Sequence, residues 1–174
     1  MRKINDVARY IGLSLLSKGL SVSPLKLQKV LYYTQAWYMV FFGRKNTLFE
    51  DVPEAWVNGP VYPTVYYEYR DKVPGMCDHL TASHFGTEDI TGTLQKLSEK
   101  LQFTRDETEL VDSIVTLYGS QTQNHLIFLS HSEKPWAEKR EGLAPFEKSN
   151  TPLSLDTMYE YYKARHERNK EKRR

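Results

Sequence analysis

Apolar residues recur at helical spacing near the start of the chain. From Ile4 to Leu15 they fall three and four residues apart, which places them on one face of a predicted helix. Gly19 then ends this helix, because glycine is typical of the position just beyond a last turn. The first predicted element is therefore an amphipathic helix that buries one face.

The stretch from residue 24 to residue 42 is apolar on nearly every side. Ser23 is a good N-cap, Pro24 suits the first helical position, and Gly43 suits the position after the last turn. A helix without a broad polar face is usually surrounded by other elements. We therefore expect helix 24–42 to be the centre of the fold.

The pattern changes after this helix. Between residues 46 and 58, short apolar pieces are broken by Pro53 and followed by Asn58-Gly59. Such punctuation is typical of two short strands or of an extended loop. Pro63 then begins a further predicted helix, because proline is favoured in a first turn.

The second half of the chain predicts more helices. Residues 72–87 have the composition of a loop, whereas the leucine spacing within 88–101 favours a helix. Thr104 and Glu107 form a capping-box pattern that begins the next helix. The remaining predicted helices are short ones at 122–130 and from Pro135, and an amphipathic one that begins near Leu155.

Together these elements predict a mostly α fold with one small β element. The length of 174 residues suits one core, so we expect a single compact domain of about seven helices around helix 24–42. The domain is predicted to span residues 1–162. Residues 163–174 are predicted to be a basic helix end or tail.

The charge of the chain is concentrated in this tail. The whole chain carries +2, and residues 163–174 hold seven Lys or Arg against two Glu, or +5, so the rest carries −3. A basic tail can contact nucleic acid, and such binding would depend steeply on salt and be lost on truncation after Tyr162. We favour a solvated helix end, where cations are stabilised by the helix dipole.

The composition indicates a cytoplasmic protein. Cys77 is the only cysteine, so no disulfide can form within the chain, as is usual in a reducing compartment. The N-terminal residues lack the apolar core of a signal peptide, and no apolar run approaches the roughly 18 residues that a membrane span needs.

Motifs for metal, phosphate or nucleophilic chemistry are missing from the sequence. The five histidines form no His-x-x-x-His pair, and no glycine-rich phosphate loop is present. We therefore expect no catalytic residue, no metal and no cofactor. We also do not expect nucleic acid as a partner, because the aromatic stretch from Glu54 to Arg70 carries more acidic than basic residues.

The segment from His131 to Trp136 carries the most interesting polar residues. We expect Pro135 and Trp136 to dock this segment on the core. His131 and Glu133 are then candidate contact residues on the surface. The alternative is an uncharacterised enzyme in which His131 and Glu133, or His125, act as acid and base.

The stretch from residue 54 to residue 70 is unusually aromatic. Trp56, Gly59, Pro60 and Pro63 are predicted to build a packed corner, because Gly59 allows a tight turn and the prolines restrict the backbone. A helix can bury only one side, so some of its tyrosines should face solvent or a partner. The candidate contact tyrosines are Tyr62, Tyr66, Tyr67 and Tyr69.

Four blocks in order resemble one known family. They are a K-L-Q-K-V-L-Y-Y-T-Q-A-W helix from Lys26 to Trp37, a G-x-x-x-x-L-F segment, an E-A-W-x-x-G-P-V-x-P-x-x-Y block, and an H-x-E-x-P-W block within residues 129–140. The chain resembles the Panacea domain of the SocA-like antitoxin family, which phage-associated GepA-like proteins also carry. Trp37 lies in the first block and is read, like Trp56, as a structural residue.

The resemblance implies an antitoxin that neutralises a toxin encoded by a neighbouring gene. It implies direct protein–protein binding and no catalytic residue. The alternative within the same family is an adaptor that delivers the toxin to a Clp-type protease. Complex formation would be driven by burial of aromatic residues inside a polar rim.

Overall fold

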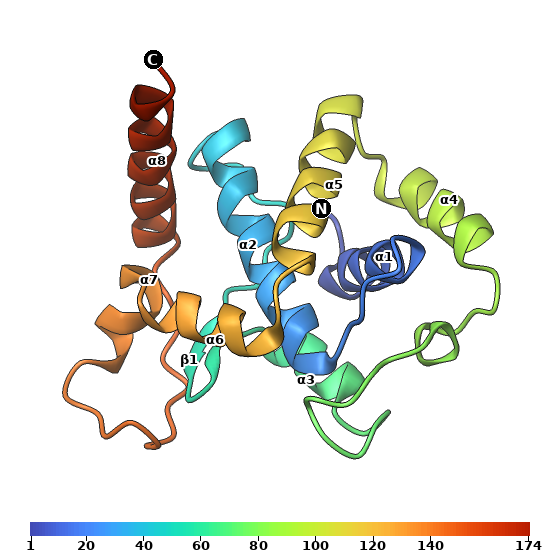
Figure 1. The fold of residues 1–174 in the computed structure, drawn as a ribbon, viewed down its shortest axis with the longest axis horizontal. Helices are drawn as coiled ribbons and strands as arrows, with labels where there is room; N and C mark the ends of the chain where they lie inside the picture. Colours follow the sequence, from blue (N-terminus) through green and yellow to red (C-terminus); the bar gives the residue numbers. More distant parts are fainter.

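A computed structural model describes residues 1–174 as one packed helical domain with a single two-stranded sheet (Figure 1). This architecture confirms the predicted mostly α fold with one small β element. Eight α-helices are present, against the seven or so expected. They are α1 (Ile4–Ser17), α2 (Pro24–Phe42), α3 (Pro63–Tyr69), α4 (Ile90–Leu101), α5 (Arg105–Gly119), α6 (Gln123–His131), α7 (Lys134–Ala137) and α8 (Leu155–Lys172); the strands are β1 (Glu54–Trp56) and β2 (Gly59–Val61).

Helix α2 is the centre of the fold, as predicted. It packs against α1, α3, α5, α6, α8 and β2, and every residue from Pro24 to Met39 is buried. Its ends follow the sequence signals: the Ser23 hydroxyl accepts a hydrogen bond from the Lys26 amide, and Gly43 has a positive φ of 110°. A helix covered on all sides needs no polar face, which explains its continuous apolar pattern.

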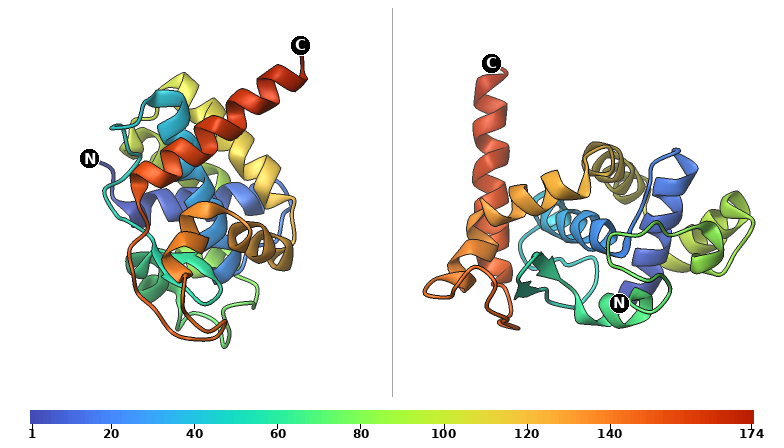
Figure 2. Two further views of the ribbon diagram at one scale, coloured as in Figure 1. Left: turned by 90° about the vertical axis from the view of Figure 1, so that its left-hand side faces the viewer. Right: turned by 60° about the horizontal axis from the view of Figure 1, so that its bottom comes forward.

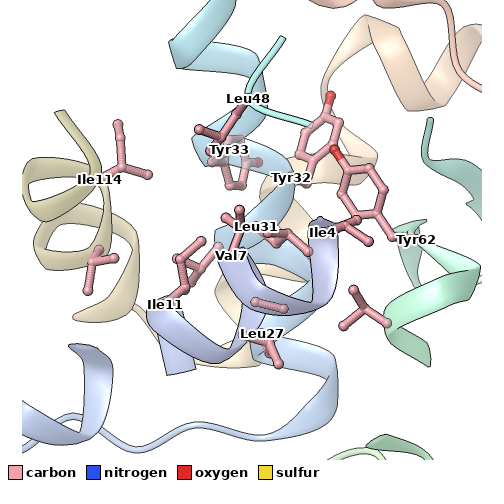
Figure 3. Close-up of a cluster of buried hydrophobic side chains, with 14 of the residues drawn as sticks. Ile4, Val7, Ile11, Leu27, Leu31, Tyr32, Tyr33, Leu48, Tyr62 and Ile114 are labelled. Atoms are coloured by element: carbon pink, nitrogen blue, oxygen red, sulfur yellow. The ribbon is translucent and has the colours of Figure 1, made fainter. Parts of the chain in front are cut away.

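The core forms where α1 and α5 cover one side of α2 and the 46–62 segment covers the other. Figure 3 shows Val7 and Ile11 of α1 in front of Leu27 and Leu31 of α2, while Ile114 of α5 approaches from one side. On the opposite side of α2, the rings of Tyr32 and Tyr62 lie toward each other (Figure 3).

Two glutamines of α2 hold the irregular chain that crosses it. The Gln28 side-chain carbonyl accepts a hydrogen bond from the Tyr62 amide, and its amino group donates to the Tyr62 carbonyl. Gln35 makes a similar pair of hydrogen bonds to an earlier part of the same chain segment. Its side-chain carbonyl accepts a hydrogen bond from the Leu48 amide, and its amino group donates one to the Phe49 carbonyl. Both glutamines are buried, so each replaces water as the partner of an otherwise unpaired peptide group.

The small sheet is paired on both sides of its first strand. β1 and β2 are antiparallel with Trp56 opposite Gly59, and Gly59 has a φ of 103° that disfavours other residues. The Ala55 amide also donates to the Thr151 carbonyl, and a bridge joins Glu54 to Pro152. The 143–153 loop is thereby fastened beside the hairpin.

Helix α8 leaves the body of the protein as it proceeds. Its first turns pack on α2 and α7, where Met158 and Tyr162 are buried. Figures 1 and 2 show the second half standing away from the other helices. The basic segment 163–174 therefore continues the same helix as far as Lys172. The last fully buried residue of this helix is Tyr162, and the residues after it are partly or fully exposed.

The structure shows which elements form between residues 72 and 107, where the sequence pattern is less regular. Residues 90–101 form α4, as the leucine spacing favours, and residues 72–87 are a loop with one 3-10 turn at Ala82–Phe85. The capping box of Thr104 and Glu107 is present in both directions. Glu107 also accepts hydrogen bonds from Arg2, which ties the N-terminus to α5.

Replacement of Gln28 by leucine should destabilise the protein strongly. The change leaves the amide and carbonyl of Tyr62 buried without partners, at roughly 1–3 kcal/mol for each group, so we expect a loss of about 2–6 kcal/mol in the free energy of unfolding. Urea unfolding followed by circular dichroism measures it. Gln95→Leu on the exposed face of α4 is the matched control and should change stability by less than about 0.5 kcal/mol. Equal effects of the two changes would contradict the role of Gln28.

Candidate functional site

The predicted corner is built by the tryptophans and prolines. The Trp56 indole N–H donates to the Glu54 carboxylate, and the Trp136 indole N–H donates to the Trp56 carbonyl at 2.8 Å. Pro63 begins α3, and Pro135 lies buried in the first turn of α7. These contacts dock the hairpin on the 131–137 segment.

The turn at Gly59 has no room for a side chain. A Cβ atom there would lie 2.7 Å from the Ser130 hydroxyl and 2.8 Å from Cε of Lys29. The neighbouring Pro60 carbonyl accepts a hydrogen bond from the Lys29 ammonium at 3.0 Å. Gly59 is thus required both by its positive φ and by the close approach of α2 and α6. Trp37, also predicted to be structural, is buried in α2 and donates its indole N–H to the Tyr118 hydroxyl.

The four candidate contact tyrosines separate into two pairs. Tyr62 is 0% exposed and packs edge-on against Phe49, and Tyr69 is 3% exposed and packs against Phe85. This burial removes Tyr62 and Tyr69 from the predicted contact surface: both belong to the core. Tyr62 lies just before α3 and is held by Gln28 of α2 through its peptide groups, and Tyr69 lies on the side of α3 that packs against Phe85.

Tyr66 and Tyr67 lie on the outer side of α3. The Trp56 and Tyr66 rings meet edge to face with centroids 4.8 Å apart, and the Tyr66 and Tyr67 rings do so at 5.4 Å. The Arg70 guanidinium lies over the Tyr67 ring at 5.0 Å, and Tyr67 is 60% exposed. Three aromatic rings and one cation therefore form a continuous accessible strip.

This strip forms one wall of a groove of about 760 Å³ between the hairpin, α3 and the 143–153 loop. The residues that line the groove are apolar or aromatic at its base and polar or basic at its edges: Leu25, Trp56, Val57, Asn58, Val61, Tyr66, Tyr67, Arg70, Met76, Lys148, Ser149 and Asn150. We call it the aromatic groove. Sequence reasoning missed Arg70, Lys148 and Asn150, because only the folded chain brings the 143–153 loop to α3.

The two polar candidates near α7 have structural surroundings. The His131 ring stacks on Trp136 with centroids 3.9 Å apart, and burial lowers its pKa, with Lys29 adding to that effect and a Val57 carbonyl opposing it. Glu133 is predicted from the sequence to lie at the surface, but the structure places it in the core, where it is only 2% exposed. No hydrogen bond joins the His131 and Glu133 side chains, because the Glu133 carboxylate is bound to other residues.

Glu133 is instead the centre of a buried polar cluster. Its carboxylate accepts hydrogen bonds from the hydroxyls of Tyr33 and Tyr162 and from the Arg165 guanidinium at 2.9 Å. Burial raises the pKa of Glu133, whereas the Tyr33 hydrogen bond and the Arg165 charge oppose that rise. The cluster joins α2, α8 and the start of α7, which explains the need for an acid at this position.

Lys29 is the least expected polar residue of the site. Its side chain is fully buried beside Gly59, its one hydrogen bond goes to the Pro60 carbonyl, and burial lowers its pKa to about 7. Lys29 is a charged residue within a helix that the sequence predicts to be buried, and this was the available sequence signal. Elsewhere in the fold, no group of three or more His, Cys, Asp or Glu side chains could hold a metal ion. No helix is long and apolar enough to cross a membrane.

The pKa of Lys29 predicts how stability changes with pH. The folded-state pKa is about 7 and the ordinary value is 10.5. Between these values the unfolded chain binds a proton that the folded chain does not, so the free energy of unfolding should rise with pH, by up to about 1.4 kcal/mol per pH unit from this group. Urea unfolding between pH 7 and about pH 9.5, below the range where tyrosines ionise, measures the slope.

Lys29→Met should reduce this slope, and Lys96→Met, which removes an exposed lysine of α4, should leave it unchanged. Identical slopes for the wild type and Lys29→Met would show that Lys29 keeps its ordinary pKa in the folded protein.

The family of the chain follows from comparison with known proteins. The model of the family described as antitoxin SocA-like, Panacea domain, matches residues 27–137. The chain matches no curated protein and no solved structure. The matched residues run from α2 through the hairpin and α3 to α7, so they include Gln28, Lys29 and Gln35 of α2, most of the aromatic groove, and Glu133. The partners of Glu133 on α8 lie outside the match. The chain therefore belongs to the SocA-like antitoxin family of Panacea-domain proteins.

Proposed function

We propose that this protein is an antitoxin that neutralises a cognate protein toxin by direct binding. Membership of the SocA-like antitoxin family supports the antitoxin role and a toxin partner in general. The observation that carries direct binding is the accessible strip of Trp56, Tyr66 and Tyr67 along one wall of the aromatic groove. We expect the toxin to be encoded by the neighbouring gene and to meet the protein in the cytoplasm.

The physical chemistry of the strip suits protein recognition. Tyrosine and tryptophan bury a large area while few rotatable bonds become fixed, so they carry a disproportionate share of interface energy. The edge-to-face contacts already hold the rings of Trp56 and Tyr66, which lowers the entropy lost on binding. Arg70 supplies a charged group at the rim of the same surface.

The titratable residues of the family blocks favour a binding role over catalysis. Glu133 is bound to three side chains in the core, Lys29 holds the hairpin, and His131 is stacked on Trp136. Glu133 and Lys29 thus have hydrogen-bond partners within the fold, and His131 has a stacking partner, although its Nε2 is buried without a hydrogen bond. We therefore assign no catalytic residue to the protein.

Co-expression with the product of the neighbouring gene tests the proposal. Growth rescue together with a complex that co-purifies is the expected result. Rescue accompanied by loss of the toxin, dependent on a Clp-type protease, would instead identify a proteolytic adaptor. A neighbouring product that is toxic but is not neutralised would overturn the antitoxin role.

Tyr67→Ala should weaken toxin binding without affecting the fold. Removing an exposed aromatic anchor typically costs about 1–2 kcal/mol of binding energy, which is about 5- to 30-fold in Kd. Isothermal titration calorimetry with a catalytically inactivated toxin measures the change. Phe128→Ala is the matched control, because Phe128 is 71% exposed on α6 and does not line the aromatic groove. Equal affinities of the Tyr67→Ala variant and the wild type would place the interface elsewhere.

A further inference from the structure

The aromatic groove has a charge that differs from that of the surrounding protein. Two of its twelve lining residues, Arg70 and Lys148, are basic, and none is acidic. The chain outside the basic end of α8 carries −3, since the total is +2 and residues 163–174 hold +5. The groove is therefore a local positive site with an apolar base on a mildly acidic domain.

Arg70 is positioned to bind an anion at one end of the groove. Its guanidinium lies over the Tyr67 ring, and its Nε bonds the adjacent Asp71 carboxylate at 3.1 Å. Its two terminal amino groups make no hydrogen bond within the chain. Because the planar guanidinium can present both groups to one carboxylate, a bidentate site is left available.

Lys148 is held on the opposite wall by the fold of its loop. Nη2 of the Arg140 guanidinium donates to the carbonyls of Ala144 and Glu147, and the loop continues into the pairing of Thr151 with Ala55. The Lys148 ammonium has no ion pair with any acid in the chain. The loop therefore brings a second cation to the groove from a distant part of the sequence, and this one has no ion pair, whereas Arg70 is paired with Asp71 through its Nε.

The base of the groove accepts an apolar side chain. Leu25, Val61 and Met76 lie there with the faces of Trp56 and Tyr66, while the Asn58 and Asn150 side chains supply amide groups at the edge. A volume of about 760 Å³ falls within the range of roughly 300–1,000 Å³ that is typical of ligand sites. Such a cavity suits a short inserted segment better than a flat surface.

We propose that the aromatic groove binds an extended acidic segment of the toxin, with one bulky apolar side chain in the groove and carboxylates on Arg70 and Lys148. The inference rests on the proposed function, because the segment is assigned to the toxin. Carboxylates fit the geometry because each cation lacks a full internal partner, and the apolar side chain fits because the base between them carries no charge.

A nucleic-acid strand fits the same groove less well. Stacking of bases on Tyr66 and Tyr67 is chemically reasonable, but a phosphate backbone requires a continuous track of cations. The groove offers two, and Glu68 and Asp71 lie close to one of them, Arg70, in the sequence. The arrangement therefore favours two isolated carboxylates over a chain of phosphates.

Fluorescent 15-residue peptides that tile the neighbouring gene's product test the inference by fluorescence anisotropy. We expect the bound peptides to contain Asp or Glu on both sides of a Leu, Phe or Trp residue. The double variant Arg70→Glu, Lys148→Glu should bind them at least 10-fold more weakly. Arg105→Glu is the matched control, because the Arg105 side chain is 90% exposed on α5 and does not line the groove, and it should bind like the wild type.

Charge exchange makes the test specific. Replacing the two acids of the best peptide by lysine should abolish binding to the wild type and restore binding to the Arg70→Glu, Lys148→Glu variant. The inference is overturned if the double variant still binds and neutralises the intact toxin as the wild type does. It is also overturned if a 15-nucleotide single-stranded RNA binds the groove and the tiled peptides do not.

Failure of the proposed function gives a different pattern. In that case the wild type itself gives no growth rescue and no complex with the intact toxin. If the wild type neutralises the toxin while the charge variants show no defect, the antitoxin role stands and only the assignment of the groove falls.

Discussion

Hydrogen bonding of the irregular chain over α2 is the constraint on which the rest of the structure depends. The 46–62 segment has little regular structure, yet it runs against a helix that is covered on all sides. Water cannot reach its inner peptide groups, and each unpaired group would cost free energy. Gln28, Gln35 and Lys29 of α2 provide the partners, at Tyr62, Phe49 and Pro60 respectively. Polar residues of a buried helix thus hold the hairpin and the chain before it in place through hydrogen bonds.

The same principle extends to α8 through Glu133. Tyr33 from α2, Tyr162 and Arg165 from α8 all converge on one carboxylate. A buried carboxylate is tolerated when it is paired and hydrogen-bonded in this way. The hairpin and α8 are therefore both oriented by polar contacts to α2, and apolar packing of α1 and α5 covers its remaining surface. The aromatic groove forms beside the hairpin, at the edge of this framework of α2 and the elements that pack on it.

Much of the frame could be predicted from the sequence because its signals are local. Ser23, Pro24 and Gly43 mark the ends of α2, and Thr104 with Glu107 marks the start of α5. The burial of Tyr62 and Tyr69 also had a signal, since Tyr62, Val65 and Tyr69 are spaced three and four residues apart and share one face. The role of Glu133 had none, because Tyr33, Tyr162 and Arg165 come to it from distant parts of the chain. Lys148 likewise comes to line the same groove as Arg70 only through the tertiary fold.

The central claim is a division between buried residues that build the frame and exposed residues that bind the toxin. Amide hydrogen exchange of the wild-type protein, with and without the inactivated product of the neighbouring gene, tests it most directly. The account predicts new protection in the hairpin, in the outer side of α3 and in residues 148–150, and little change in α4 or in the end of α8. Protection confined to α4 or to the basic end of α8, with the hairpin unchanged, would contradict it.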